Sequence, residues 1–240
     1  MLKKIAIGLL VLLLAVAGVV AVVYQVEGQA LPEAGQYLEG TSYAATTEAD
    51  GTLLFSPARP NGHGLLVMPG ALVQPLAYAK TAAFFADIGY TVLVPRGALR
   101  LPINAVEPAA ARMAELGMDD WFIIGHSMGG FSGLELITRH APAVKAVALW
   151  ACEMPVDYSS LELPMIFIRG DRDGLLTDER LAGVQARLPS SVRYITLPGG
   201  NHQGFALYSH QFFDNPATTS TERQISLAND RTARFFASQF

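Results

Sequence analysis

The chain has 240 residues, of which 51% are hydrophobic and 16% are charged, and its formal net charge is -4. These values exclude a disordered or collagen-like chain, and without a basic block nucleic acid is not expected as a partner. The single cysteine, Cys152, excludes an internal disulfide framework and a multi-cysteine zinc site. The hydrophobic share is above the usual range, which indicates one ordinary domain with an added apolar segment.

The apolar segment lies at the amino terminus. From Ile5 to Tyr24 the chain carries no charge, and two lysines precede this run. A helix of about 20 residues spans a hydrocarbon core of roughly 30 Å, and the lysines favour a cytoplasmic amino terminus. Residues 1–30 are therefore predicted to be a signal-anchor, with a cleaved signal peptide as the competing interpretation. Either one exports the remainder, to the outer side of the cell membrane or, after cleavage, to a secreted or periplasmic location.

Residues 31–50 are polar and small, which predicts a tether, and the folded domain is expected over residues 51–240. Within this domain, short apolar runs alternate with segments of helical periodicity. The predicted strands are 64–68, 91–94, 121–124, 144–150, 165–168 and 192–197, and the predicted helices are 76–88, 104–116, 128–140, 177–188 and 221–239.

This alternation predicts an α/β fold, a doubly wound and mostly parallel sheet with helices on both faces. Ligands of such sheets bind outside the carboxyl ends of the strands. We therefore expect the chemistry in the loops after Met68, Ile124, Ile168 and Leu197.

The loop after Ile124 carries a nucleophile motif. It reads Gly-His-Ser-Met-Gly-Gly over residues 125–130, between a predicted buried strand and a predicted helix, which is the setting of a G-x-S-x-G nucleophile elbow. The glycines permit the strained turn that such an elbow needs, whereas a serine that only caps a helix does not require three of them. Ser127 is the predicted nucleophile.

A serine hydroxyl needs a base to take its proton, and in this architecture the acid and then the histidine follow the serine along the chain. His202 follows the last predicted strand in a glycine-rich loop and is the predicted base. The other four histidines are assigned to the surface or to packing. They are His63, His126, His140 and His210.

The loop after Ile168 offers the acid. Asp173 is favoured because a glycine follows it, and Asp171 is the alternative, with a role in capping the turn or in a salt bridge. Glu153 and Asp157 are weaker candidates from the preceding loop.

A tetrahedral intermediate also needs two preset donors for its negative oxygen. The backbone amide of Met128, at the start of its helix, is one. Ala71, in the loop after Met68, is predicted to supply the other, with Leu72 as the fallback.

In combination these residues resemble the α/β-hydrolase superfamily. Residues 69–78 and 125–130 look most like its small, lidless bacterial branch, the alpha/beta hydrolase family 5 type, and are also similar to cutinase-like and dienelactone-hydrolase-like esterases. The resemblance covers about residues 50–240 and implies a triad of Ser127, Asp173 and His202, with Ala71 and Met128 as oxyanion donors. The elbow has serine where dienelactone hydrolases proper have cysteine, and the paired cysteines of many secreted cutinases are absent.

The expected activity is hydrolysis of carboxylic esters through an acyl-enzyme. No cofactor or metal is expected, because the chain has no H-E-x-x-H, C-x-x-C or dinucleotide fingerprint. An acyltransferase on the same triad and a membrane-anchored binding protein with a vestigial site remain as alternatives.

The short connection from Ala151 to Leu163 leaves no room for a lid of several helices, so the site is expected to be open to small-molecule or surface-accessible esters. Four further side chains are candidates for the acyl pocket, although each also fits a role in the core or at the rim. They are Tyr78, Trp150, Met154 and Phe205.

Overall fold

The computed structural model describes residues 9, 13, 16, 18, 20–140 and 143–239. Half of the segment predicted as a signal-anchor or signal peptide, residues 1–30, therefore lies outside the described residues, and its role stays a prediction. Within the described residues, no helix combines the length and the apolar character that crossing a membrane requires.

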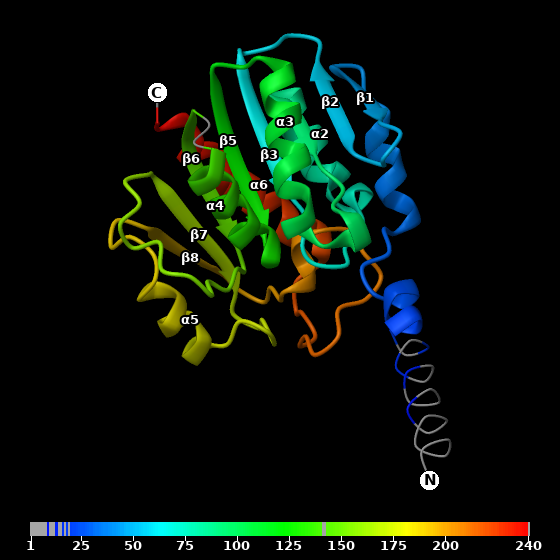
Figure 1. Ribbon diagram of the computed structural model, residues 1–240, viewed down its shortest axis with the longest axis vertical. Helices are drawn as coiled ribbons and strands as arrows, with labels where there is room; N and C mark the ends of the chain where they lie inside the picture. Colours follow the sequence, from blue (N-terminus) through cyan, green and yellow to red (C-terminus); the bar gives the residue numbers. More distant parts are fainter. Residues whose placement is uncertain are drawn as a thin grey trace.

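An eight-stranded sheet forms the centre of the described chain, in the order β1-β2-β4-β3-β5-β6-β7-β8 (Figure 1). The strands from β3 onward pair in parallel, whereas β1 and β2 pair antiparallel at one edge. The predicted mostly parallel sheet is thus confirmed, and β5, which leads to Ser127, lies near its middle. The strands are β1 (Tyr43–Thr47), β2 (Leu53–Pro57), β3 (His63–Met68), β4 (Thr91–Val94), β5 (Asp120–His126), β6 (Val144–Trp150), β7 (Met165–Gly170) and β8 (Arg193–Leu197).

Helices cover both faces of the sheet, as the α/β pattern predicts. The side chains of Thr177 and Ser220 accept hydrogen bonds from backbone amides three residues on, which fixes where α5 and α6 begin. The helices are α2 (Ala79–Asp87), α3 (Val106–Leu116), α4 (Met128–His140), α5 (Asp178–Gln185) and α6 (Thr221–Ala237). Short 3-10 turns complete the fold: η1 (Pro32–Leu38), η2 (Pro75–Tyr78), η3 (Ala98–Arg100), η4 (Pro102–Ala105) and η5 (Gln203–Phe205).

The predicted tether, residues 31–50, is wrong, because this stretch is part of the domain. η1 buries Ala34 completely against Leu207 and Ile225, and β1 forms the edge of the sheet. An edge strand with one exposed face needs few large apolar residues, so its sequence looks like a linker. The folded domain begins near Ala30, which forms a β-bridge with Tyr208.

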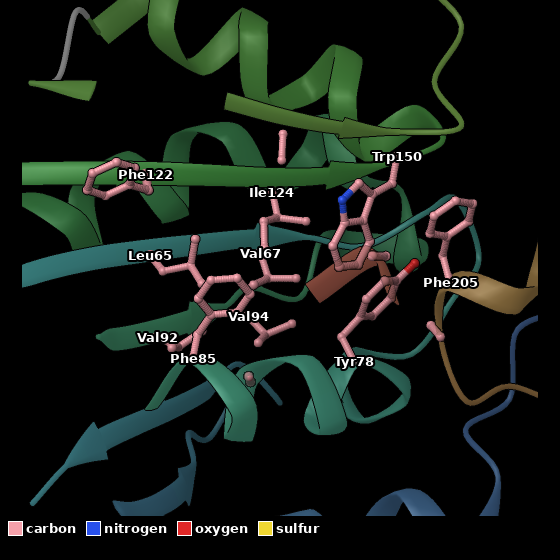
Figure 2. Packing of buried hydrophobic residues seen from close by; sticks show 14 of the residues in the cluster. Leu65, Val67, Tyr78, Phe85, Val92, Val94, Phe122, Ile124, Trp150 and Phe205 are labelled. Carbon is pink, nitrogen blue, oxygen red and sulfur yellow. The ribbon is translucent and has the colours of Figure 1, made fainter. Parts of the chain in front are cut away.

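The core on the α2 and α6 face is rich in aromatic rings. Figure 2 shows Phe85 and Phe122 among branched aliphatic side chains of the central strands. Phe236, from α6, packs with its ring centroid 4.7 Å from that of Phe122 and 6.1 Å from that of Phe85. The terminal helix is therefore held to the sheet by this aromatic contact.

Replacing Phe236, which is fully buried, with alanine is expected to lower the free energy of unfolding by about 3–5 kcal/mol, because a cavity opens in the core. Phe213→Ala is the matched control, since that ring is 91% exposed, and should change the value by no more than about 0.5 kcal/mol. Urea titration measures both. Equal losses would contradict the packing of α6.

Candidate active site

Ser127 stands on a sharp turn between β5 and α4. Its φ of 52° lies in the left-handed region that residues other than glycine rarely adopt. The Ser127 amide donates to the Trp150 carbonyl at 2.8 Å, and its carbonyl accepts from the Gly130 amide at 3.0 Å. A Cβ on Gly125 would lie 2.4 Å from Gly130 Cα, and one on Gly129 would lie 2.2 Å from Met68 O. Close packing therefore requires these glycines and holds the serine in its strained conformation.

His202 and Asp173 form a buried pair. His202 Nδ1 lies 2.9 Å from Asp173 Oδ2, and the two side chains are 3% and 0% exposed. Asp173 Oδ1 also accepts from the amides of Leu175 and Leu176, at 2.9 and 2.7 Å, which fixes the carboxylate. The favoured acid is thus the one in contact with the histidine, whereas Asp171 accepts from the Gly199 amide at 2.7 Å and stabilises the turn.

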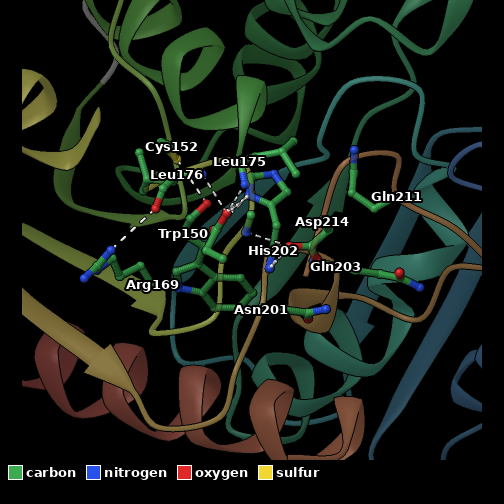
Figure 3. Close-up of polar contacts among 12 residues, drawn as sticks. Trp150, Cys152, Arg169, Leu175, Leu176, Asn201, His202, Gln203, Gln211 and Asp214 are labelled. Atoms are coloured by element: carbon green, nitrogen blue, oxygen red, sulfur yellow. Dashed lines mark hydrogen bonds and ion pairs between the residues drawn. The ribbon is translucent and has the colours of Figure 1, made fainter. Parts of the chain in front are cut away.

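Asp214 binds the backbone of the loop that carries His202 (Figure 3). The sequence alone did not predict this contact. Asp214 Oδ1 accepts from the amides of His202 and Gly174, at 3.3 and 2.9 Å, and its Oδ2 accepts from the Gln203 amide at 2.8 Å. Backbone amides leave no pattern of residue types, so only the fold identifies Asp214. This one carboxylate joins the loop of the acid to the loop of the histidine.

Ser127 and His202 line the same cavity, whose volume is about 760 Å³. A neutral imidazole that donates from Nδ1 to Asp173 has an unprotonated Nε2, and His202 Nε2 is buried with no hydrogen-bond partner among the described residues. The other lining residues are mostly apolar: Ile103, Met128, Phe131, Ala151, Glu153, Met154, Pro155, Leu175, Leu176, Arg180, Gly183, Val184 and Arg187.

Met154 lines the cavity as predicted, but Tyr78, Trp150 and Phe205 do not. All three are at most 1% exposed and belong to the core cluster on the α2 and α6 face. Trp150 stacks on Phe205, with the ring centroids 5.6 Å apart, and donates from Nε1 to Thr232 Oγ1 at 3.1 Å. Their assignment to the acyl pocket is corrected: alternate side chains at the end of a strand point to opposite faces, which turns Trp150 away from the cavity, and Tyr78 and Phe205, from η2 and η5, pack into the same core cluster.

The segments that carry the two predicted oxyanion donors are in close contact, since a Cβ on Gly129 in α4 would lie 2.4 Å from the Pro69 carbonyl oxygen in the loop that carries Ala71. As the first residue of α4, Met128 has an amide without an intrahelical acceptor. The Leu72 amide is already bonded to the Arg100 carbonyl at 2.7 Å, which removes the fallback. Ala71 and Met128 therefore remain the predicted pair.

A second histidine, His126, precedes Ser127 in the elbow and is fully buried. Tyr78 Oη accepts from the Gly70 amide at 2.8 Å and lies 2.7 Å from His126 Nδ1, while His126 Nε2 lies 3.1 Å from the His202 carbonyl. Because a carbonyl only accepts, Nε2 carries the proton and Nδ1 accepts from the tyrosine hydroxyl. Burial, and then the proximity of His202, lowers the pKa of His126 well below its usual value, so the ring is neutral. This chain of bonds links the Gly70 loop to the His202 loop.

Comparison with known proteins identifies the family of the chain. The model of the Alpha/beta hydrolase family matches residues 64–226, and the chain belongs to that family. No curated protein sequence matches it.

Solved structures of the same fold include XC6422 from Xanthomonas campestris, described as an α/β serine hydrolase without lid. It has 16% identity and a TM-score of 0.56, over 82% of this chain and 96% of that one. The serine hydrolase CCSP0084 from Cycloclasticus zankles has 12% identity and a TM-score of 0.55, over 84% and 99%. A bromoperoxidase from Bacillus anthracis has 10% identity and a TM-score of 0.57, over 82% and 100%. At these identities the likeness shows the fold alone.

Tyr78→Phe is expected to lower the free energy of unfolding by about 1–3 kcal/mol, because the Gly70 amide and His126 Nδ1 lose their partner inside the core. Tyr194→Phe is the matched control, since the Tyr194 hydroxyl is buried and has no hydrogen-bond partner among the described residues. Denaturant unfolding of both variants measures the difference. If Tyr194→Phe costs as much as Tyr78→Phe, the hydroxyl of Tyr78 does not hold this network.

Proposed function

We propose that the protein is a serine hydrolase that cleaves carboxylic esters. One observation carries the proposal: His202, whose Nδ1 is held by Asp173 and whose Nε2 has no partner among the described residues, lines the same cavity as Ser127. A nucleophile, a base and an orienting acid are the three groups that acyl transfer requires.

In this mechanism, Nε2 of His202 removes the proton from Ser127 Oγ as the oxygen attacks the ester carbonyl. The new C–O bond moves the carbonyl electron pair onto oxygen, where the amides of Ala71 and Met128 would stabilise the charge. His202 then gives its proton to the departing alcohol, and the acyl group stays on Ser127. Water, deprotonated by the same imidazole, attacks the acyl-enzyme, and the bond to Ser127 Oγ breaks as His202 returns the proton to that oxygen. The acid is released, and Asp173 stabilises the imidazolium in both halves.

The cavity supports a mainly apolar substrate. Its volume of about 760 Å³ lies in the usual range for ligand sites, roughly 300–1,000 Å³, and most of its lining side chains are apolar. At its edge, Arg180 and Glu153 form an exposed ion pair at 2.7 Å and neutralise each other. The connection over residues 151–164 contains no helix, so no lid covers the site from this side.

We place the domain outside the cytoplasm as part of the same proposal. The uncharged run from Ile5 to Tyr24, after two lysines, supports an anchor in the cell membrane with the catalytic domain on the outer side. Cleavage of residues 1–30 would instead release the domain.

Ser127→Ala is expected to lower kcat/KM for a chromogenic ester on the order of 10³-fold or more, because no other group near His202 replaces the attacking oxygen. Ser226→Ala is the control, since its exposed hydroxyl bonds only the Glu222 carbonyl of its own helix, at 2.8 Å. Steady-state kinetics measure both variants. Turnover near that of the parent in Ser127→Ala would rule out this serine as the nucleophile.

Asp173→Asn is expected to lower kcat on the order of 10³-fold or more, because the amide neither fixes the tautomer of His202 nor stabilises its cation. Asp171→Asn serves as the matched change two residues away, where the carboxylate bonds only a backbone amide, and should cost less than about tenfold. The same ester assay compares them. A larger loss in Asp171→Asn would reassign the acid.

A further inference from the structure

The amino-terminal segment is bonded directly to the domain, without a flexible linker. The Arg100 guanidinium lies over the Tyr24 ring, 3.8 Å from its centroid, and donates to the carbonyls of Tyr24 and Glu27. The Glu27 side chain accepts from Gln211 Nε2 at 2.9 Å and from the Phe212 amide at 3.2 Å. The uncharged run ends at Tyr24, so almost no chain separates it from the first docked residues.

This attachment is at the catalytic edge of the sheet. A Cβ on Gly28 would lie 2.3 Å from the Leu72 carbonyl, in the loop that carries Ala71. Phe212 lies in the same loop as Asp214, whose carboxylate accepts a hydrogen bond from the His202 amide. Figure 1 shows the helical residues 20–26 beside this orange loop, with the β2–β3 turn at the opposite end of the molecule.

Large apolar side chains are exposed around the same point. Val26 is 45% exposed, Leu99 is 69% exposed and Phe213 is 91% exposed, and they are next in sequence to Glu27, Arg100 and Phe212. Because Arg100 and Phe212 both bond Glu27, the exposed side chains lie around a single residue. Leu99 and Phe213 also have positive φ, of 57° and 67°, a conformation that residues other than glycine rarely adopt.

We propose that this apolar rim, formed by Val26, Leu99 and Phe213, contacts the surface of a lipid bilayer, so that the opening of the active site faces the membrane. The occupant follows from the chain itself: a run of bilayer length ends at Tyr24, and Glu27 is already fixed to the domain. A bilayer crossed by that run must meet the domain at this edge. Burying the three side chains in the interface removes apolar surface from water, which favours this contact. The inference rests on the membrane anchor proposed above and is independent of the hydrolytic step.

The test uses the full-length chain in phosphatidylcholine vesicles that contain a nitroxide-headgroup lipid as quencher. A maleimide fluorophore is attached to Phe213→Cys and, separately, to Leu99→Cys. Cys152 stays unlabelled, because it is fully buried and burial raises the pKa of its thiol. Ala58→Cys is the matched control: Ala58 is exposed and follows β2 at the amino edge of the parallel strands.

We expect the nitroxide lipid to reduce emission from positions 213 and 99 severalfold more than emission from position 58. Equal quenching at the three positions, no quenching at 213 and 99, or failure of the chain to remain with the vesicles would each overturn the proposal. In vesicles without nitroxide, emission that falls as the number of protein copies per vesicle rises would indicate contact between copies. This result would also overturn the proposal. Ester hydrolysis by the same samples is a separate readout, so an inactive protein with a quenched rim would refute the esterase and leave the membrane contact intact.

Discussion

The backbone turn at Ser127 is the constraint on which the site depends. A serine in the left-handed backbone region is unfavourable by itself and persists only where the surrounding structure fixes it. Here β5 ends under it, α4 begins at the next residue, and the glycines at 125 and 129 allow the strand, the helix and the Pro69 loop to approach within contact distance. Because the hydroxyl is carried by the centre of the sheet, its position is as rigid as the core.

The histidine, in contrast, is carried by a loop, and its rigidity comes from hydrogen bonds. Asp173 fixes the ring, Asp214 fixes the backbone, and His126 bonds the carbonyl of the same residue. These three contacts come from three different segments and fix the ring and the backbone of a histidine that is also buried, with its ring centroid 4.9 Å from that of His126. Polar networks of this kind are costly unless every buried member is satisfied, and Tyr78 completes the one behind the elbow.

The sequence predicts those parts that local patterns specify. The α4 boundaries, Met128 to His140, are as expected, and the loops that follow β5, β7 and β8 contain the serine, acid and histidine in the order of the motif. Prediction fails where burial depends on distant partners. Ala34 is buried only because Leu207 and Ile225 cover it, so residues 31–50 resemble a tether. Trp150 points to α6 and not to the cavity, because the face of a strand end is set by the sheet. Asp214 accepts hydrogen bonds from backbone amides, and a contact of this kind leaves no pattern of residue types in the sequence.

The central claim is that Ser127 forms a covalent acyl intermediate during ester cleavage. Mass spectrometry of the protein, acid-quenched during turnover of an activated ester and digested, tests it most directly. We expect a peptide containing Ser127 that is heavier by the acyl group minus one hydrogen, and that disappears when His202 is replaced by alanine. Continued turnover with the acyl group on another residue, or with no adduct on Ser127 even at saturating substrate and after a burst of product, would contradict it.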